Sequence, residues 1–454
     1  MRSEVNEEAV DLTIFTTMDK ISRLLIAGIK TSLSKSSVKI PCFIKKLTIS
    51  GVLLLSLVFM SFAQAIGNHT TLQNDSVISE HDSNQQEGDL VGEISPMTGY
   101  DWKGTNGFFI RSKDSRFRLN FGAYTQARYD INWQQESAGD NDVEKEFSFN
   151  RTRIFFKGHA TPMLNYHVRF NIDEDGDSDL VVGFLQFNMG KKWSLRAGKQ
   201  FIAMSREDWM WAEDILTTEF SAHDSTFALG AADGLQANFQ SSQQRFWLAL
   251  SNGSAAANAL AASEDQADIA LTGRWEYQLR GKDWSVWDDL IGRKGRSQGI
   301  LLGLGAGYQS EKEQSILDRV AQLIADISIN GDGYQAMLAA SLTQHLPREG
   351  ASFTNYGMLA QGGYFFTEHF QAYAQYNLVS PGDQPGDADT FQSISAGLNY
   401  FPFSWTNRLK FSAEFAHLFS IFNNTIVVPS ASLGWLPSDE DKQTYLTLQA
   451  QFGF

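Results

Sequence analysis

The sequence predicts an all-β fold, namely a transmembrane, antiparallel, up-and-down β-barrel of about 16 strands with an inward-folded third outer loop. Long segments alternate apolar and polar residues, short and long connections alternate along the chain, and the last strand ends at Phe454. After residue 66 no apolar run approaches the roughly 20 residues that a membrane helix needs. In barrel strands apolar residues alternate with polar ones and form no continuous apolar run, so the lack of such a run is compatible with a membrane protein.

An early apolar run predicts a secretory signal peptide. Lys45 and Lys46 precede the apolar core, and a small-x-small triplet ends at Ala65, where we expect cleavage. The alternative is an N-terminal anchor helix. The polar stretch that follows predicts a flexible periplasmic leader. The predicted units are residues 1–65, an upstream extension plus signal peptide; residues 66–115, the leader; and residues 116–454, the outer-membrane barrel.

Charge and cysteine content exclude several classes of site. The single cysteine, Cys42, precedes the cleavage site, so the mature chain has neither disulfides nor thiolate metal ligands. The formal charge of the whole chain is −15. Removal of a segment with eight Lys/Arg and five Asp/Glu makes it −15 − 3 = −18. A chain this acidic is not expected to bind nucleic acid, and we expect no cofactor.

The strand prediction rests on side chains that alternate between two faces. From Phe117 to Ile131 the odd positions are mainly apolar and the even positions mainly polar. The segment 321–330 has the weakest pattern, and a short helix over Ser315 to Ala325 is its alternative. The predicted strands are 117–131, 147–160, 164–173, 180–189, 193–200, 228–240, 245–252, 268–280, 299–310, 321–330, 334–345, 355–367, 370–379, 391–402, 408–418 and 443–454.

Connections between these segments mostly alternate in length, as expected for short periplasmic turns and long outer loops. Residues 281–298 are the departure, because a long connection stands where a short turn is due. Aromatic residues gather beside the short turns, where rings suit the membrane–water boundary. These are Phe187, Trp193, Phe246, Trp247, Phe365, Phe366, Tyr400, Phe401, Phe403 and Trp405.

The C-terminal strand carries a sharp local signal. Phe454, Phe452, Ala450 and Leu448 share one face, and polar residues share the other. A terminal Phe that closes an amphipathic strand resembles the signal by which outer-membrane barrels are recognised. We therefore expect the barrel-assembly machinery to bind this end through Phe454. The alternative is a soluble β-sandwich that happens to end in Phe.

Several patches resemble the phosphate-selective porin O and P family. They are Phe149–Phe155 with Gly158, Leu195–Gln200, Asn252-Gly253, Gly397–Phe401 and Leu448–Phe452. The resemblance spans residues 117–454 and implies an outer-membrane location, a homotrimer in lipid, and passive diffusion of small hydrophilic or anionic solutes, with phosphate as an expected anion. The sequence departs from the family after Gln200, where no proline follows, and at Ser310–Glu313, which lacks a lysine cluster.

Basic residues on the polar parity of their strands predict the pore lining. Such residues would attract anions, and the guanidinium fork matches phosphate or carboxylate oxygens. The alternative is that they pair with wall carboxylates such as Asp130, Asp173 and Glu276. The predicted pore-lining and anion-binding residues are Arg118, Arg128, Arg151, Arg153, Lys157, Arg169, Arg196 and Arg274.

The long connection 201–227 is the predicted constriction loop. Its carboxylates would face the lumen arginines and create a transverse field; the alternative is that they face the outer solvent. The predicted constriction residues are Arg206, Glu207, Asp208, Glu213 and Asp214, with Glu219 and Asp224 beside them.

No catalytic motif stands out, so we predict a channel and no enzyme. The acidic run Asp173–Asp179 has its glycine in the wrong place for an EF-hand, and we expect a solvated outer turn without a specific metal. The predicted function is an outer-membrane porin with an arginine-lined, water-filled lumen. The alternatives are a general porin without anion preference, and a β-barrel enzyme or adhesin.

Overall fold

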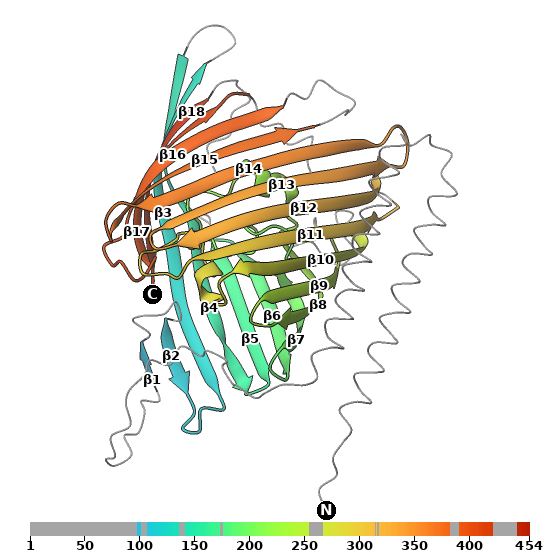
Figure 1. Ribbon diagram of the computed structural model, residues 1–454, viewed down its shortest axis with the longest axis vertical. Helices are drawn as coiled ribbons and strands as arrows, with labels where there is room; N and C mark the ends of the chain where they lie inside the picture. The colour runs from blue at the N-terminus through green and yellow to red at the C-terminus, as the bar shows by residue number, and fades with distance from the viewer. Residues whose placement is uncertain are drawn as a thin grey trace, which may run out of the picture. The chain divides into compact units, whose positions relative to one another are not determined.

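The computed structural model describes residues 98–100, 107–135, 141–172, 176–253, 267–313, 315, 317–381, 390–420 and 443–454. The predicted signal peptide, Cys42 and most of the predicted leader lie outside these residues. Sixteen strands, β3 to β18, pair antiparallel with their neighbours in sequence order, and β18 pairs with β3 to close the sheet (Figure 1). The predicted closed, antiparallel barrel is confirmed.

The barrel strands are longer than those of most globular proteins, as the span of a membrane requires. Their bounds are β3 Arg118–Gln135, β4 Asn141–Thr161, β5 Leu164–Ile172, β6 Ser178–Met189, β7 Trp193–Phe201, β8 Ala231–Gln240, β9 Gln244–Ser251, β10 Ala267–Arg280, β11 Gly299–Glu311, β12 Leu317–Gly331, β13 Tyr334–Pro347, β14 Phe353–Phe365, β15 Phe370–Ser380, β16 Phe391–Tyr400, β17 Leu409–Leu418 and β18 Thr444–Gly453.

The weakest predicted strand, 321–330, lies inside β12, so the alternative helix over Ser315 to Ala325 is wrong. Val320 and Ile324 are buried there, and the strand pairs with both neighbours along its length. Pairing on both sides explains the outcome, because each neighbour satisfies the backbone groups of a segment whose own pattern is weak.

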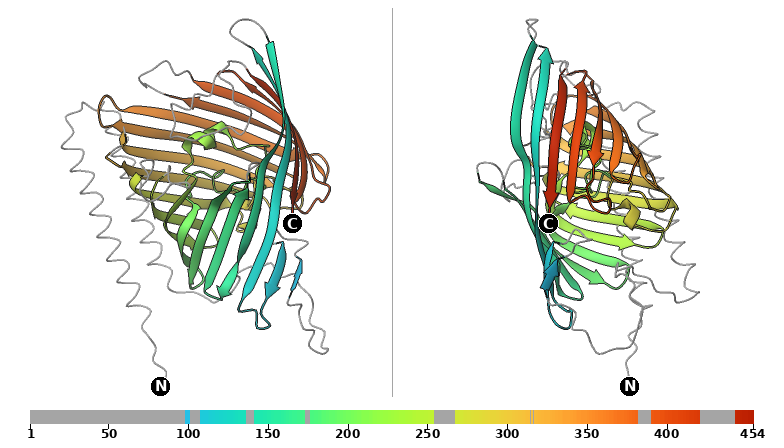
Figure 2. Two further views of the ribbon diagram at one scale, coloured as in Figure 1. Left: turned by 180° about the vertical axis from the view of Figure 1, so that it is seen from behind. Right: turned by 90° about the vertical axis from the view of Figure 1, so that its left-hand side faces the viewer.

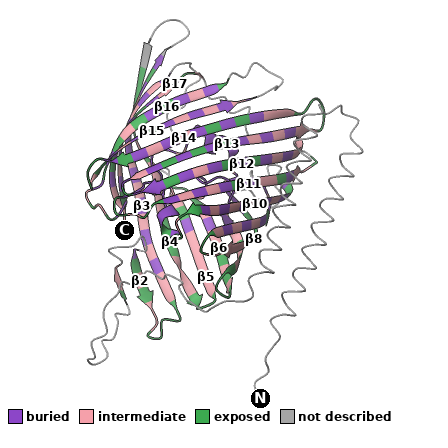
Figure 3. Cartoon of the chain, in the orientation of Figure 1, coloured by how far each residue is buried: buried purple, intermediate pink, exposed green. Residues whose placement is uncertain are grey.

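Alternation along the strands sorts side chains to the outside and the inside of the barrel, as the banded colouring shows (Figure 3). On β13, Leu338 is 58% exposed on the outer face, whereas its neighbour Met337 is 2% exposed on the inner face. The polar face is the inner one: Gln335, Ser341 and Thr343 of the same strand are buried there. The two-residue pattern therefore places apolar side chains toward lipid and polar ones toward the lumen.

The barrel closes through the two ends of the β-sheet. β18 pairs with β3 from Thr444↔Trp133 to Gly453↔Tyr124. Past the strand end, the Phe454 N–H donates to the Ala123 carbonyl at 2.9 Å. Two further short strands, β1 (Thr98–Tyr100) and β2 (Phe108–Arg111), precede the barrel, and β2 pairs with the first residues of β3.

Aromatic rings form a band on the outer face near the short turns. Phe370 stacks on Tyr400 at 4.7 Å between centroids and on Phe366 at 5.9 Å. Three residues expected in this band lie inside instead: Trp247, Phe365 and Phe401 are buried. Trp247 and Phe365 have inner parity on their strands, and Phe401 directly follows β16. All three lie inside the barrel, against inward-folded segments of the chain.

Two connections fold inward and fill much of the barrel. One is the chain between β7 and β8, and the other is the connection between β10 and β11 (Figure 2). Each contributes fully buried apolar side chains, such as Met204 and Ile291. Separately, none of the helices in the described part of the chain has both the length and the apolar character needed to cross a membrane.

Candidate functional site

The third outer loop, residues 202–230, lies inside the barrel as the sequence predicts. Met204, Ile215 and Leu216 are fully buried. The loop ends in a short helix, α3 (Ala222–Phe227), whose N-cap Ser221 accepts a hydrogen bond from the Asp224 N–H at 2.9 Å. An outer loop with this much buried apolar surface is held against the wall by the hydrophobic effect.

Polar side chains of the wall hold the loop backbone in place. Arg274 on β10 donates to the Met204 carbonyl at 2.9 Å, and Lys410 on β17 donates to the Ile215 carbonyl at 3.2 Å. Buried loop carbonyls need partners, and side chains from β10 to β18 and from β3 supply them. Further donors in this set are Asn399 to Leu216, Asn407 to Glu213, Gln451 to Glu213 and Arg128 to Thr218.

A glycine on β14 makes room for the helix α3. A Cβ atom added at Gly357 would stand 2.1 Å from the Phe227 ring, far inside van der Waals contact. The opposite end of the loop is similarly close, because a Cβ at Gly305 would meet the Met204 carbonyl oxygen at 2.5 Å. The small residues of the wall thus fix how closely the loop approaches it.

Glu219 joins the loop to two predicted pore arginines. Arg128 lies 3.3 Å from one carboxylate oxygen, and Arg151 forms an ion pair with the other. Asn150 and the Phe220 N–H also donate to this carboxylate, at 3.0 and 3.1 Å. Burial alone would raise the pKa of Glu219, but the guanidiniums of Arg151 and Arg128 lower it to about 2. The group is therefore an anion at neutral pH.

Glu213 makes the second ion pair between the loop and the wall. Arg169 on β5 donates to its two oxygens at 2.8 and 3.2 Å. The same guanidinium lies 3.8 Å from the ring centroid of Trp211, another residue of the loop. Burial opposes ionisation of Glu213, but Arg169 outweighs it and the pKa is lowered.

Arg274 and Arg206 form a separate buried network with Glu276. Arg274 donates to Glu276 at 2.9 Å and to both oxygens of Asp326 on β12, at 2.8 and 3.0 Å. Arg206 of the loop lies 3.4 Å from the same Glu276. These four side chains are at most 1% exposed, so they have no contact with bulk water. For Arg274, the structure thus shows the carboxylate pairing considered above as the alternative to an anion site.

The remaining loop carboxylates are buried, apart from the half-buried Asp214, and do not point to the outer solvent. Ser221 donates to Glu207 through its N–H at 3.1 Å and its hydroxyl at 2.5 Å. Asp208 is also buried, and Asn407 donates to Asp214. Burial raises the pKa of Glu207, Asp208 and Asp214, and it raises that of Asp224 to about 7. Only Glu213 and Glu219 therefore directly oppose wall arginines.

The wall of β4 to β7 carries the other predicted basic residues at half-buried positions. Arg151, Arg153 and Lys157 lie on β4, and Lys157 is the register partner of His167 on β5. Arg196 on β7 donates to Gln186 at 2.9 Å and lies 4.3 Å from the Phe184 ring centroid. The Arg153 Nε atom has no hydrogen-bond partner among the described residues.

Arg118 stands apart from this group. It lies at the start of β3, where its Nε donates to Asn120 at 2.9 Å and its guanidinium lies 4.7 Å from the Phe109 ring of β2. Asp173 lies outside the described residues, as do the next two residues of the acidic outer turn. Among the residues with described positions, no group of His, Cys, Asp or Glu could hold a metal ion.

Sequence reasoning overlooked charged residues that share the polar parity it had already identified. Asp326, Lys410 and Glu414 all point inward and are buried. Glu414 accepts from the Tyr373 hydroxyl at 2.7 Å and from the Thr218 N–H at 2.9 Å. Their parity could have marked them as inner residues, but their loop partners depend on how residues 202–230 fold.

Comparison with known proteins agrees with this architecture. A family model described as phosphate-selective porin O and P matches residues 121–278. No curated protein matches the chain. An anion-selective porin from Comamonas acidovorans is similar in structure, with 11% sequence identity and a TM-score of 0.52 over 74% of this chain and 100% of that chain.

Two other solved structures cover a similar share. OmpT of Vibrio cholerae, in trimer form, has 11% identity and a TM-score of 0.49 over 74% of this chain and 99% of that chain. The outer membrane channel DcaP of Acinetobacter baumannii has 12% identity and a TM-score of 0.46 over 76% and 99%. The chain thus has the closed-barrel fold of the anion-selective porin, and its residues 121–278 resemble the phosphate-selective porin O and P family.

Proposed function

We propose that this porin is an anion-preferring diffusion channel, without catalytic activity, whose solutes pass along the wall of β4 to β7. The observation that carries the proposal is an unequal burial of the inner face. Inner side chains of β10 to β18 are almost all buried beneath the inward-folded segments, for example Gln371 and Gln449. Inner side chains of β4 to β7 keep partial exposure, for example Gln186 and Asn188.

Glu144 and Glu146 lie exposed near the outer end of β4, and the half-buried charged residues of this wall are basic. They are Arg151, Arg153, Lys157 and Arg196. An anion that moves along this wall meets successive guanidinium and ammonium groups, each of which can donate hydrogen bonds to its oxygens. Several weak sites in sequence favour entry and still allow exit, as conduction requires. Small anions with oxygen atoms, phosphate included, fit this chemistry.

A weakly selective general porin is the second candidate, and one observation favours it. Glu219 neutralises charge on Arg128 and Arg151, and Glu213 neutralises Arg169. These pairs reduce the positive potential along the wall. The balance then depends on the other basic residues of this wall, Arg153, Lys157 and Arg196.

The two candidates differ in reversal potential across a planar bilayer under a KCl gradient. We expect the intact protein to prefer chloride, and the triple variant Arg153→Gln, Lys157→Gln, Arg196→Gln to lose that preference. A charge-matched control is Lys191→Gln, Lys192→Gln, Arg280→Gln, because these three side chains are exposed outside the lumen at the ends of strands. Cation preference in the intact protein, or an equal effect of both triple variants, would overturn the proposal.

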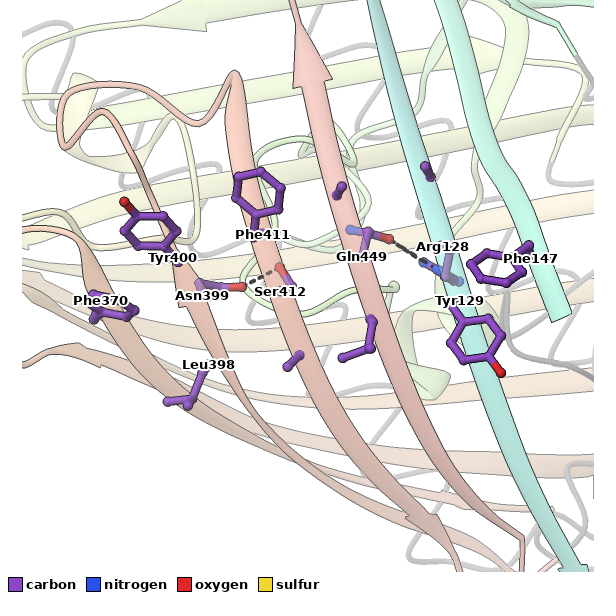
Figure 4. A pocket seen from close by; sticks show the side chains of 14 residues that line it. Arg128, Tyr129, Phe147, Phe370, Leu398, Asn399, Tyr400, Phe411, Ser412 and Gln449 are labelled. Carbon is purple, nitrogen blue, oxygen red and sulfur yellow. Dashed lines mark hydrogen bonds between the residues drawn. The ribbon is translucent and has the colours of Figure 1, made fainter. Parts of the chain in front are cut away.

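We also propose that three copies assemble in the membrane through a hollow on the outer face. The hollow, of about 530 Å³, lies across β15 to β18 and β3 (Figure 4). Alanines at 127, 413 and 450 form its floor, and rings such as Phe370 and Phe411 form its rim. Small residues let a neighbouring barrel approach closely, and rings of that neighbour would fill the space. Ala450→Phe fills the hollow, so SDS-resistant trimers should be lost while the heat-modifiable monomer remains.

The C-terminal strand is proposed to be the part that the barrel-assembly machinery binds, through Phe454. Support comes from its position: the Phe454 ring remains 36% exposed at the end of the closing strand, near Phe452 and Phe108. A partner that guides closure of the barrel could reach it there.

A further inference from the structure

The connection between β10 and β11, residues 281–298, is called the inlet lobe below. It stands at the end of the barrel where every other connection is a short turn, yet its middle is buried. Trp287, Leu290 and Ile291 are at most 1% exposed, and Trp284 and Val286 at most 8%. A surface turn would not bury five large apolar side chains in so short a segment.

Hydrogen bonds attach the inlet lobe to strands on widely separated parts of the wall. The Trp284 Nε1 donates to the Ser241 carbonyl, in the turn after β8, at 2.6 Å. Asn330 on β12 donates to the Val286 carbonyl at 2.5 Å. At its other end, Arg293 donates to the Ser404 carbonyl, in the turn before β17, at 2.9 Å. The lobe therefore reaches from the β8 side of the barrel to the β17 side.

Apolar contacts follow the same path across the lumen. Trp284, Val286 and Trp287 pack with Leu301 on the inner face of β11. Ile291 packs with Phe365 and Phe401, two of the rings that were expected on the outer band. This packing explains why those rings point inward. The buried area makes the lobe a fixed part of the barrel interior.

The inlet lobe also meets the third loop directly. The Leu290 N–H donates to the Asp214 carbonyl at 2.9 Å, and Arg206 donates to the Trp287 carbonyl at 2.5 Å. Leu290 packs in one cluster with Met210 and Ile215 of the loop. Two segments that enter the barrel from opposite ends thus share one backbone–backbone hydrogen bond, one side-chain–backbone hydrogen bond and a common apolar cluster.

A charge pair within the lobe stiffens its shape. Arg296 donates to Asp289 at 2.8 and 2.5 Å. Burial would raise the pKa of Asp289, but Arg296 outweighs burial and the pKa is lowered. Asp289 also accepts from the Ile291 N–H at 2.8 Å, which fixes the bend that carries Ile291 into the barrel.

We propose that the inlet lobe is a second constriction element: it closes the lumen beneath β8 to β17 from the periplasmic end, holds the third loop in place, and so confines solutes to the wall of β4 to β7. This inference rests on the proposed function in one respect, namely that solutes cross through the lumen. It adds that pore size is set from both ends of the barrel, by segments that enter opposite mouths and bind each other.

The test replaces residues 282–298 by Asn-Gly, so that Gly281 and Gly299 flank a two-residue hairpin loop between paired strands. β10 and β11 already pair up to Arg280↔Ile300, so the shortened connection can close. Single-channel conductance should rise roughly twofold or more, because a second route opens beside the first. Larger uncharged sugars should also enter liposomes that contain the variant. Unchanged conductance and unchanged sugar cut-off in a folded barrel would overturn the inference.

A full-length variant guards against failure of the shortened chain to fold. Trp287→Ala with Leu290→Ala removes the packing on β11 and on the third loop but keeps the chain length. We expect higher conductance with frequent fluctuations between levels, as the lobe and the loop detach. The matched control is Lys282→Ala with Asp283→Ala, two exposed residues of the same lobe. If both double variants have the conductance of the intact protein, the inlet lobe does not limit conductance and the inference is overturned.

The two proposals fail in different measurements. Ion preference of the intact channel tests the basic wall. Conductance and sugar cut-off of the lobe variants test the inlet lobe and do not depend on which ion is preferred. An intact channel without anion preference whose conductance still rises in the lobe variants would support the constriction and reject the anion path.

Discussion

Arg169 on β5 binds Glu213 of the third loop through two hydrogen bonds, of 2.8 and 3.2 Å. The guanidinium also covers the Trp211 ring at 3.8 Å, so one wall residue holds both a charge and a ring of the loop. Bidentate arginine–carboxylate pairs are among the strongest polar contacts in proteins. The pair fixes the loop at the edge of the basic wall, and it also cancels one of the positive charges there.

Glu213→Gln separates these two effects. The amide can still accept a hydrogen bond from Arg169, but the positive charge of Arg169 is no longer balanced. We expect a reversal potential shifted further toward chloride, because the potential along β4 to β7 becomes more positive. The shift should shrink at high salt, since exposed charges are screened over about 10 Å at 0.1 M.

Glu207→Gln is the control for this change. Glu207 lies in the same loop and is fully buried, and its partner is Ser221 on the loop itself. It should leave the reversal potential near that of the intact protein. A shift toward cations in Glu213→Gln, or an equal shift in both variants, would contradict the assigned role of Arg169.

Arg274→Met tests the buried network on β10 and β12. The change leaves Glu276 and Asp326 without their main partner in a dry interior, and breaking a buried ion pair costs about 3–5 kcal/mol. The temperature at which the barrel unfolds in SDS should therefore fall. Arg274→Met combined with Asp326→Asn should recover part of the loss, because one of the two stranded charges is gone. No recovery in the double variant would mean that Arg274 acts through packing alone.

The barrel could be predicted from the sequence because a membrane strand has an apolar, lipid-facing residue at every second position. Alternation placed Arg128, Arg151 and Arg274 on the inner face before any contact was known. Alternation does not give the register between neighbouring strands, so the Arg274–Asp326 pair, which reaches across β11, could not be found. Alternation also gives no information about loops, and the partners of Glu213 and Glu219 depend on the whole path of residues 202–230.

The position of the inlet lobe inside the barrel could not be predicted from local sequence either. The sequence marked residues 281–298 by their length alone. Their buried residues, such as Trp287 and Ile291, have no period that relates them to a sheet face. Their position inside the barrel follows from partners far along the chain, such as Phe365 and Phe401. Tertiary packing therefore determines where the inlet lobe lies, and the local sequence pattern does not predict it.

Gly357→Ala tests how closely helix α3 must approach the wall. The added Cβ would lie 2.1 Å from the Phe227 ring, so the helix must move or the ring must turn. Overpacking of this kind costs about 1–3 kcal/mol, and a displaced loop should change single-channel conductance. Phe227→Ala in the same chain should restore the conductance. The control is Gly273→Ala, whose Cβ would meet nothing closer than 3.5 Å. Equal effects of both glycine changes would reject the close-approach argument.

Asp224→Asn tests the buried carboxylates of the third loop by their pH dependence. Burial raises the pKa of Asp224 from 3.8 to about 7, so the folded state takes up a proton between those values. Stability that depends on the protonated form is present below pH 4 and is lost as the pH rises through 7. The variant stays neutral, and Ser205 can still donate to the amide oxygen. It should therefore unfold at a higher temperature than the intact protein at pH 8 but not at pH 4. The same difference at both pH values would reject the titration.

Phe454→Ala separates recognition of the last strand from its contribution to the folded barrel. The backbone bonds between Phe454 and Ala123 do not involve the ring, which is 36% exposed, so refolding in detergent should keep its yield. In cells, we expect much less heat-modifiable barrel in the outer membrane, because the assembly machinery loses the ring that it binds. Phe452→Ala is the control, since this ring is on the same face and 52% exposed. If both variants assemble equally in cells, the terminal ring is no signal, and if Phe454→Ala also fails to refold in detergent, its role is structural.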